Sequence, residues 1–518
     1  MNSTRTFNPL ALNQMSPNAI RELHIRLLDF IDVATTATNR ATFYNSKQES
    51  QELVEAIHGD MIAAHRGIYT LAAAIPGATD YTQQRVLFHL LSKKRTGSRE
   101  LPGEVEQKVI EVILQRMPTH RALNAFLNLQ KAGVNNARTR RTILAYCLNA
   151  PKLDFWAIKY RRKLATLLRH VWGVRNASII RKILAKDAEQ WTVQEQGIIG
   201  RQVHKFVRNS DRLAFVGECV GFVLGTDRAY SQHLFQAFEG AKKDLNRGKA
   251  LPYEVLEGIR STYHPRKSNA EVLKLTKENL TVNQQKNFQR KAEVERTEVH
   301  FDPNRYQPME LYRYAFQMGM TTDIQQALIR KARQAAENSE GAGGKVAIVL
   351  DTSLSMKGSD EQEYLAISRV LAIRDMLATQ ADDFRVYGLD RSQTCEPFEL
   401  VECTGETSVA DRLLDALLWE PDQVYMLTDG YENTPAGRVD EVMEQVREMG
   451  IETPVMQVNP VSAKESGSVR KLSLFVTMLP MSLTSDLTLG QIRVAVADNL
   501  EVGLNMIWKK TQYLFEPS

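Results

Sequence analysis

The chain has 518 residues, too many for one hydrophobic core, so we expect two or three domains. With 43% hydrophobic and 25% charged residues, the composition is that of an ordinary globular protein, and no apolar run approaches the ~20 residues of a membrane span. The four cysteines form no disulfide or zinc pattern and the N-terminus carries no secretory signal pattern, so we expect a cytoplasmic protein without a membrane partner.

The net charge of +5 conceals an uneven distribution along the chain. Residues 1–340 hold 51 Lys and Arg against 33 Asp and Glu, a balance of +18. Residues 341–518 hold 15 Lys and Arg against 28 Asp and Glu, a balance of −13. Because a strongly basic part favours an acidic partner, nucleic acid is the first candidate for residues 1–340.

Most of this basic part is predicted to be helical, because apolar residues recur at spacings of three and four and Gly, Pro or Asn separate most segments. The pattern predicts an α-helical repeat domain of stacked, HEAT-like pairs over residues 1–338. A polar stretch at 261–307 interrupts it, and could be a loop, a solvated helix or a nucleic-acid contact. The expected helices are 46–75, 80–95, 103–117, 120–133, 136–150, 154–173, 176–191, 308–318 and 323–338.

Four basic clusters with aromatic residues among them lie in these helices. Phosphates attract cations and unpaired bases stack on aromatic rings, so the clusters indicate nucleic-acid binding. The alternative is that each cluster is a solvated helix face and that Phe155 and Trp156 belong to the core. Four clusters in a part this basic favour the first interpretation. The candidate residues are Lys93, Lys94, Arg95, Arg138, Arg140, Arg141, Lys159, Arg161, Arg162, Lys163, Arg169 and His170, with Arg181 and Lys182 as the fourth cluster. Within that set, Lys159, Arg162, Lys163 and Arg169 are spaced to share one helical face.

After a Gly-rich linker at 337–345, the stretch KVAIVLDTSLSM begins an α/β pattern. The apolar run 346–350 predicts a strand buried on both faces, and residues 363–380 predict the helix that follows. The loop between them carries Asp351, Ser353 and Ser355. Ligands bind at this edge of doubly wound sheets, and Mg²⁺ takes oxygen ligands. The alternative is a capped turn, because Asp and Ser also accept hydrogen bonds at helix starts.

Two later segments bring further oxygen ligands. Thr407 follows Gly405 and precedes a helical pattern, although Thr404 and Ser408 stand close by. Asp429 ends a second apolar strand that begins at residue 423. The stretch GAGGK at 341–345 precedes a strand, so it is not a phosphate-binding loop, and we find no catalytic motif. We therefore expect no enzymatic activity.

Together these segments resemble the metal-ion-dependent adhesion site of von Willebrand factor A domains. The shared pattern is Asp-x-Ser-x-Ser, then Gly-x-Thr, then a strand-terminal Thr-Asp-Gly, and the resemblance covers residues 344–518. It implies a Rossmann-like α/β domain with bound Mg²⁺ or Mn²⁺. It also implies that Asp351, Ser353, Ser355 and Thr407 are direct or water-bridged ligands and that Asp429 completes the shell.

A basic helical part followed by such a domain resembles the Ro (TROVE-domain) family, and the junction at 311–336 with VAIVLDTSLSM looks like that of the family. The resemblance implies helical repeats closed into a ring that binds small non-coding Y RNAs on its basic outer surface. Single-stranded 3′ ends of misfolded RNAs can enter the cavity of such rings. It further implies a non-catalytic role in RNA quality control, in bacteria together with an exoribonuclease.

A second interpretation is a metal-dependent protein-interaction adaptor, because many intracellular von Willebrand A proteins work with MoxR-type AAA+ ATPases. A carboxylate of the partner would then complete the metal shell at Asp351, Ser353 and Ser355. A third interpretation is a metal-dependent nuclease or phosphatase, which would need more acidic residues near the metal than the sequence places there.

Overall fold

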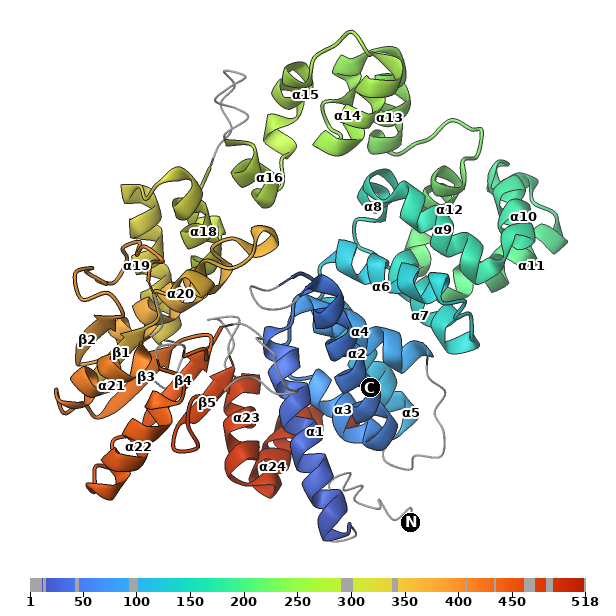
Figure 1. Ribbon diagram of the computed structural model, residues 1–518. Helices are drawn as coiled ribbons and strands as arrows, with labels where there is room; N and C mark the ends of the chain where they lie inside the picture. Colours follow the sequence, from blue (N-terminus) through green and yellow to red (C-terminus); the bar gives the residue numbers. More distant parts are fainter. Residues whose placement is uncertain are drawn as a thin grey trace. The chain divides into compact units, whose positions relative to one another are not determined.

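The computed structural model describes residues 12, 15–41, 46–92, 101–289, 301–337, 343–405, 408–432, 435–460, 471–480 and 488–516. The chain packs as two compact units (Figure 1). The first unit consists of Met1–Leu90, Arg95–Arg116 and Pro303–Ser518, and the second consists of Leu91–Lys94 and Met117–Asp302. The N-terminal helices therefore pack with the C-terminal part of the chain, while the domain boundary near residue 340 stays a prediction.

As the sequence predicts, every regular element that the structure describes in the second unit is a helix. Helices that are close in sequence pack on one another, for example α6 on α9, α9 on α10 and α10 on α12. The described part of the polar stretch that begins at residue 261 contains two helices, Asn269–Thr276 and Val282–Asn287, with turns and irregular residues around them. The helices of this unit are α6 (Thr119–Lys131), α7 (Ala137–Leu148), α8 (Leu153–Lys159), α9 (Arg161–Trp172), α10 (Val174–Leu184), α11 (Val193–Gln202), α12 (Leu213–Leu224), α13 (His233–Lys243), α14 (Tyr253–Tyr263), α15 (Asn269–Thr276) and α16 (Val282–Asn287).

Two segments that the periodicity predicts as single helices are each two helices, so those two predictions are wrong. The segment 154–173 breaks at Tyr160, whose backbone N–H closes α8 on the Trp156 carbonyl and whose φ is −114°. The segment 46–75 breaks at His65 in the same way. Apolar spacing continues through both breaks because the residues on either side are buried, so spacing alone does not register a change of helix axis.

In the described part of the first unit, five α-helices precede residue 117 and two more lie just before the linker. A capping box between Ser46 and Glu49 starts the second helix. The buried Arg66 guanidinium holds the Glu106 carboxylate at 2.8 and 2.9 Å and so joins the third helix to the fifth. These helices are α1 (Pro17–Thr36), α2 (Lys47–Ala64), α3 (Arg66–Ala73), α4 (Asp80–Ser92), α5 (Gly103–Arg116), α18 (Pro308–Met318) and α19 (Thr322–Glu337).

The rest of this unit is a doubly wound α/β sheet. Within the described residues it has five strands, all parallel, in the order β2-β1-β3-β4-β5. The strands are β1 (Lys345–Leu350), β2 (Asp383–Gly388), β3 (Gln423–Leu427), β4 (Val455–Asn459) and β5 (Thr477–Pro480). The helices are α20 (Leu365–Gln380), α21 (Val409–Leu417), α22 (Arg438–Glu448), α23 (Thr488–Asp498) and α24 (Leu500–Thr511). In this order the connections reverse direction between β1 and β3, where doubly wound sheets bind ligands.

Both faces of the sheet are covered. Ala347 and Val349 of β1 pack in one core with residues of α21 and α22. Alternate residues such as Ile348 point to the opposite face, where α20 packs on β1 and β2 (Figure 1). Helix α20 is itself buried from Leu365 to Ala378, because α18 and α19 pack on it from the other side.

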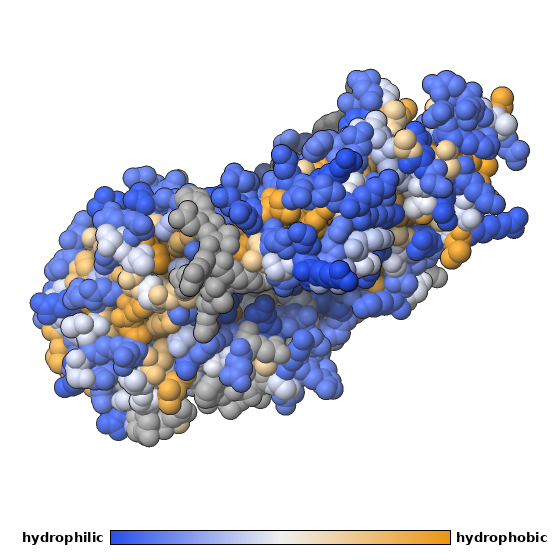
Figure 2. Space-filling view, turned by 90° about the horizontal axis from the view of Figure 1, so that it is seen from above, coloured by the Kyte–Doolittle hydropathy of each residue, from blue (hydrophilic) through white to orange (hydrophobic). Residues whose placement is uncertain are grey.

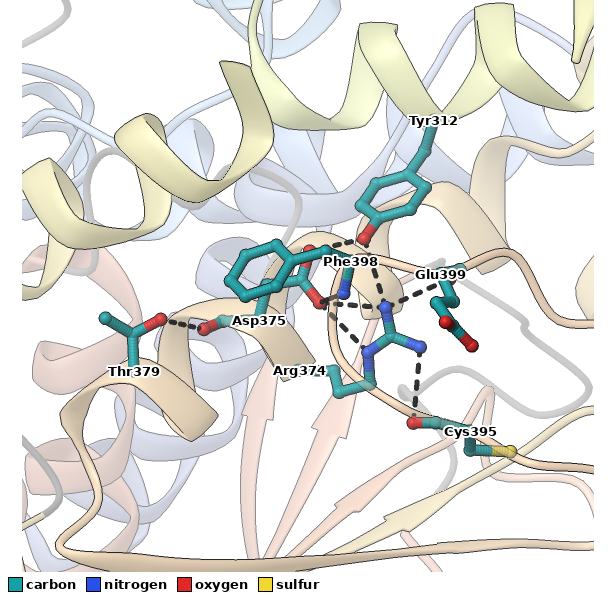
Figure 3. Close-up of polar contacts among 7 residues, drawn as sticks. All are labelled: Tyr312, Arg374, Asp375, Thr379, Cys395, Phe398 and Glu399. Atoms are coloured by element: carbon teal, nitrogen blue, oxygen red, sulfur yellow. Dashed lines mark hydrogen bonds and ion pairs between the residues drawn. The ribbon is translucent and has the colours of Figure 1, made fainter. Parts of the chain in front are cut away.

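A buried polar network joins α18 to α20 (Figure 3). The Tyr312 hydroxyl donates to the Asp375 carboxylate, and the Arg374 guanidinium holds the same carboxylate at 2.8 Å and the Tyr312 oxygen at 3.0 Å. Arg374 also donates to the Glu399 carbonyl at 3.1 Å, and Asp375 accepts from the Phe398 N–H at 3.0 Å. Burial raises the pKa of the Tyr312 phenol well above its usual value, so the phenol remains a donor. The network therefore fixes α20 to α18 and to the loop after β2.

A further buried ion pair joins the N-terminal and C-terminal parts of the chain. The Arg493 guanidinium of α23 holds the Asp32 carboxylate of α1 at 2.9 and 3.3 Å, and α1 and α23 lie side by side (Figure 1).

The face of the molecule drawn in Figure 2 is mostly hydrophilic, with hydrophobic residues in separate patches. Among the described helices, none combines the length and apolar character required to cross a bilayer.

Replacing Asp375 with Ala should lower the free energy of unfolding by roughly 3–5 kcal/mol, because Arg374 would remain buried without an anion. The matched control is Arg391→Ala, which removes an exposed ion pair to Asp415 and should cost less than about 1 kcal/mol. Urea unfolding followed by circular dichroism measures both. Equal effects of the two substitutions would contradict a supporting role for the network.

Candidate metal centre and nucleic-acid interface

The acidic residues predicted from the sequence meet at the reversal point of the sheet. Asp351 directly follows β1, and its backbone N–H donates to the Leu427 carbonyl at the end of β3, at 3.0 Å. Asp429 stands two residues beyond that carbonyl. Because β1 and β3 are parallel neighbours in register, both acids lie at the carboxyl edge of the sheet.

The Asp351 carboxylate is 1% exposed and is held on both oxygens. One oxygen accepts from the Ser353 N–H at 2.9 Å, and the other accepts from the Thr428 hydroxyl at 2.7 Å. Burial raises the pKa of this carboxyl, although the hydrogen bonds from Ser353 and Thr428 oppose that rise. An ionised Asp351 is therefore costly here unless a cation compensates it.

The two serine hydroxyls have the separation expected of neighbouring ligands. Ser353 Oγ and Ser355 Oγ lie 3.0 Å apart and both side chains are buried. In an octahedron with Mg–O bonds of about 2.1 Å, adjacent oxygens are also about 3.0 Å apart. The two hydroxyls could therefore bind one cation in place of their mutual hydrogen bond, and the distance between their oxygens would not need to change.

Asp429 is held by the neighbouring strand ends. Its carboxylate accepts from the Tyr431 N–H at 3.1 Å, and its carbonyl accepts from the Asn459 amide at 2.9 Å. Thr428 belongs to the Thr-Asp-Gly pattern but was not expected to support Asp351, and Asn459 was missed in the sequence. Each is a polar residue at the end of an apolar strand, and that position could have identified them.

The described residues fit a hard cation of the Mg²⁺ type, because Asp351, Asp429 and the two hydroxyls supply only oxygen ligands. Thr407 lies outside the described residues, but the Thr404 N–H donates to the Thr352 carbonyl at 2.8 Å, so the chain just before Thr407 reaches the site. In the described part of the chain, no three His, Cys, Asp or Glu residues cluster as a metal site. The candidate set thus depends on hydroxyls as well as carboxylates.

The loop that carries the serines is fixed against the N-terminal helices. Beyond Ser355, the Ser359 hydroxyl donates to the Ala41 carbonyl at 3.0 Å. The Gln362 amide donates to the Thr38 hydroxyl and to the same carbonyl, both at 2.8 Å. The α1–α2 connection therefore takes part in positioning the candidate cation site.

The basic candidate residues differ in whether their side chains already make packing contacts within the fold. Lys93, Lys94 and Arg95 lie outside the described residues. On α7, Arg140 and Arg141 are exposed and Arg138 is partly buried. Since α8 ends at Lys159 and α9 begins at Arg161, the expectation of one helical face from Lys159 to Arg169 is wrong.

Several candidates on α8 and α9 have packing roles. The Arg161 guanidinium lies 4.5 Å from the centre of the Phe222 ring, and Lys163 donates to the Asn124 side chain at 2.8 Å. His170 contacts the Val134 carbonyl at 2.8 Å, and Lys159 lies 3.7 Å from Glu254. These residues hold neighbouring helices together, so their part in any nucleic-acid contact stays a prediction.

Other cations on the same helices are exposed. Arg141, Arg162, Arg169, Arg175 and Lys182 have no carboxylate partner among the described residues. Residues 119–212, from α6 to just before α12, hold 19 Lys and Arg against five Asp and Glu. This surplus is the electrostatic pattern of a surface that binds phosphates.

Comparisons with known proteins find similarity at the level of structure. No family model and no curated protein matches the chain. Among solved structures, the chain is similar to the crystal structure of the Ro (RSR) protein of Deinococcus radiodurans. The identity is 15% and the TM-score 0.37, and the match covers 91% of this chain and 99% of that chain.

We propose that Asp351, Ser353, Ser355 and Asp429 hold a divalent cation, and expect Mg²⁺ to raise the thermal unfolding midpoint. Asp351→Asn should abolish that rise, since the amide keeps the shape but loses the charge. Asp390→Asn, an exposed acid in the same domain, is the control and should respond like the natural protein. Differential scanning fluorimetry with and without Mg²⁺ decides, and an Mg²⁺ response retained by Asp351→Asn would contradict the site.

Proposed function

We propose that the protein is a non-catalytic RNA-binding protein of the Ro type. The observation that carries this proposal is the set of exposed cations on α7, α9 and α10, which no carboxylate neutralises in the described part of the chain. Cations left unpaired on adjacent helices attract a polyanion and repel one another without it. The acidic α/β part, with a balance of −13, would keep the polyanion on the helical part.

The ligand that this proposal assigns is a small, structured non-coding RNA or the single-stranded end of a misfolded RNA. Structured RNA is recognised largely through its phosphates and shape, which suits arginines spread over several helices. In this proposal the HEAT-like helices close into a ring, the von Willebrand A domain carries Mg²⁺ or Mn²⁺, and the protein works in cytoplasmic RNA quality control. An exoribonuclease is the proposed protein partner.

A second candidate function is the metal-dependent adaptor for an AAA+ ATPase. Leu354 favours it, because this side chain is 55% exposed between Ser353 and Ser355, which are buried. An apolar side chain beside a cation suits a partner that presents a carboxylate next to an apolar residue. In that case the helical part would position the partner rather than bind RNA.

The RNA proposal predicts a strong inverse dependence of affinity on salt. Replacing Arg141, Arg162 and Arg169 with Glu should reduce the slope of log affinity against log salt by about 2–3, roughly one per lost phosphate contact. The RNA that co-purifies at low salt is the probe, and filter binding over a salt series is the measurement.

The matched control reverses three exposed charges in the acidic part, Arg391, Lys509 and Lys510, and should leave the slope unchanged. An unchanged slope in the α7 and α9 variant would refute the nominated surface. If no RNA co-purifies but a protein is held in Mg²⁺ and released both by a chelator and by Leu354→Asp, the adaptor function replaces the RNA proposal.

A further inference from the structure

One buried arginine of the α/β part differs from all the others. The buried arginines that the structure describes are Arg66, Arg369, Arg374, Arg412 and Arg493. Four of them hold a carboxylate at 2.7–2.9 Å, namely Glu106, Asp375, Asp415 and Asp32. Arg369, which is 7% exposed, has no carboxylate partner in the described part of the chain.

The Arg369 side chain lies at the carboxyl edge of the sheet. It leaves α20 one turn after the helix begins, and its Nη1 donates to the Pro460 carbonyl at 2.5 Å. Pro460 follows the last residue of β4, Asn459, whose amide donates to the Asp429 carbonyl. The guanidinium therefore lies at the edge where doubly wound sheets bind ligands.

Most of the hydrogen-bonding capacity of Arg369 is unused. A guanidinium has five N–H donors, and a single acceptor, the Pro460 carbonyl, contacts this one among the described residues. Its Nε is buried and has no partner. By contrast, Arg374 lies five residues further along the same helix and reaches a carboxylate, a phenol oxygen and two backbone carbonyls. A buried N–H donor of a charged group without an acceptor costs stability, so the binding of a group that accepts this hydrogen bond is strongly favoured.

A second guanidinium reaches the chain just before the same helix. Arg313 of α18 is half-buried and donates to the Glu363 carbonyl at 3.2 Å, just before α20 begins. Burial first, and then the charge of Arg313, lower the pKa of Arg369 to about 10. Arg40 of the α1–α2 connection is close to Arg313 and, after burial, lowers its pKa too, while Glu310 and Glu363 oppose that effect. The charges of Arg313 and Arg369 thus disfavour one another, and no carboxylate pairs with Arg369 in the described part of the chain.

We propose that Arg369, together with Arg313, forms a binding site for a phosphate-type oxyanion at the carboxyl edge of the sheet. A phosphate has several acceptor oxygens, so it can contact two guanidinium groups at once, and arginine binds such groups with two parallel hydrogen bonds. This site goes beyond the proposed RNA-binding surface, since it lies on α20 and α18 rather than on α7 and α9. Its occupant is inorganic phosphate, a phosphate monoester or a terminal phosphate of an oligonucleotide.

The first test is the thermal unfolding midpoint of the full chain against inorganic phosphate, with sodium chloride added to keep the ionic strength constant. The natural protein should gain roughly 2–4 °C for each tenfold rise in phosphate above the dissociation constant. Arg369→Met should lose that gain. Without phosphate, its midpoint should equal or exceed that of the natural protein, because a buried unpaired charge has been removed.

A merely structural Arg369 gives a different result, namely a lower midpoint for Arg369→Met at every phosphate concentration. The matched control is Arg374→Met, which removes a paired arginine from the same helix and should lower the midpoint while keeping the phosphate gain. Arg313→Met, at a half-buried position, should weaken the phosphate response without unfolding the protein. A phosphate gain retained in Arg369→Met, or none in the natural protein, would overturn the proposal.

Four probes identify the source of the phosphate. We compare inorganic phosphate, adenosine monophosphate, and a short oligoribonucleotide with and without a 5′-phosphate. A larger shift with the phosphorylated oligonucleotide than with the unphosphorylated one supports an RNA end as the ligand, and a shift with the small anions alone supports a small metabolite. The charge-reversed α7 and α9 variant should keep the phosphate shift, so failure of the RNA surface and failure of this site are distinguishable.

Discussion

A buried contact among a carboxylate, a guanidinium and a phenol holds the α/β sheet to the helices before the linker. Asp375 and Arg374 lie on α20, which is buried on all sides, so neither charge can reach water and each must be satisfied by the other or by a neighbour. Tyr312 of α18 supplies the third member. Because α20 follows the loop with the candidate cation ligands, the orientation of that loop depends on this contact.

The same constraint explains why the N-terminal helices pack with the C-terminal part of the chain. Asp32 and Arg493 would each be a costly buried charge alone, and together they fix α1 to α23. The α1–α2 connection then reaches the loop after Ser355, where Gln362 and Ser359 bond to it. A cation at the acidic edge of the sheet would therefore stabilise a loop that the N-terminal helices already contact.

Two arginines on one helix show that a buried charge with partners supports the fold, whereas a buried charge without a partner indicates a binding site. Arg374 has acceptors for nearly all of its donors and belongs to the support of the fold. Arg369 has one acceptor, the Pro460 carbonyl, among the described residues. Places where a chain departs from the rule that buried charges are paired are commonly functional places, since the departure costs stability. The exposed cations of the helical unit do not lower stability in this way, because they are solvated. They indicate a function because they greatly outnumber the acidic residues around them.

The sequence by itself determined the order and type of most elements, because apolar spacing within a few turns reports directly on burial. It placed α18 at its observed bounds and placed Asp351 and Asp429 at strand ends that meet at one edge. Residue spacing could not locate the breaks at Tyr160 and His65, nor predict a pair such as Asp32 and Arg493, 461 residues apart.

Only the tertiary structure decided which cations pack against other helices and which are exposed. Arg161 and Lys163 are packed, whereas Arg162 and Arg169 are exposed. It also decided that Arg369 lacks the acid that every other described buried arginine has. The physical reason is that charge pairing depends on which distant elements meet, whereas periodicity depends only on neighbours along the chain.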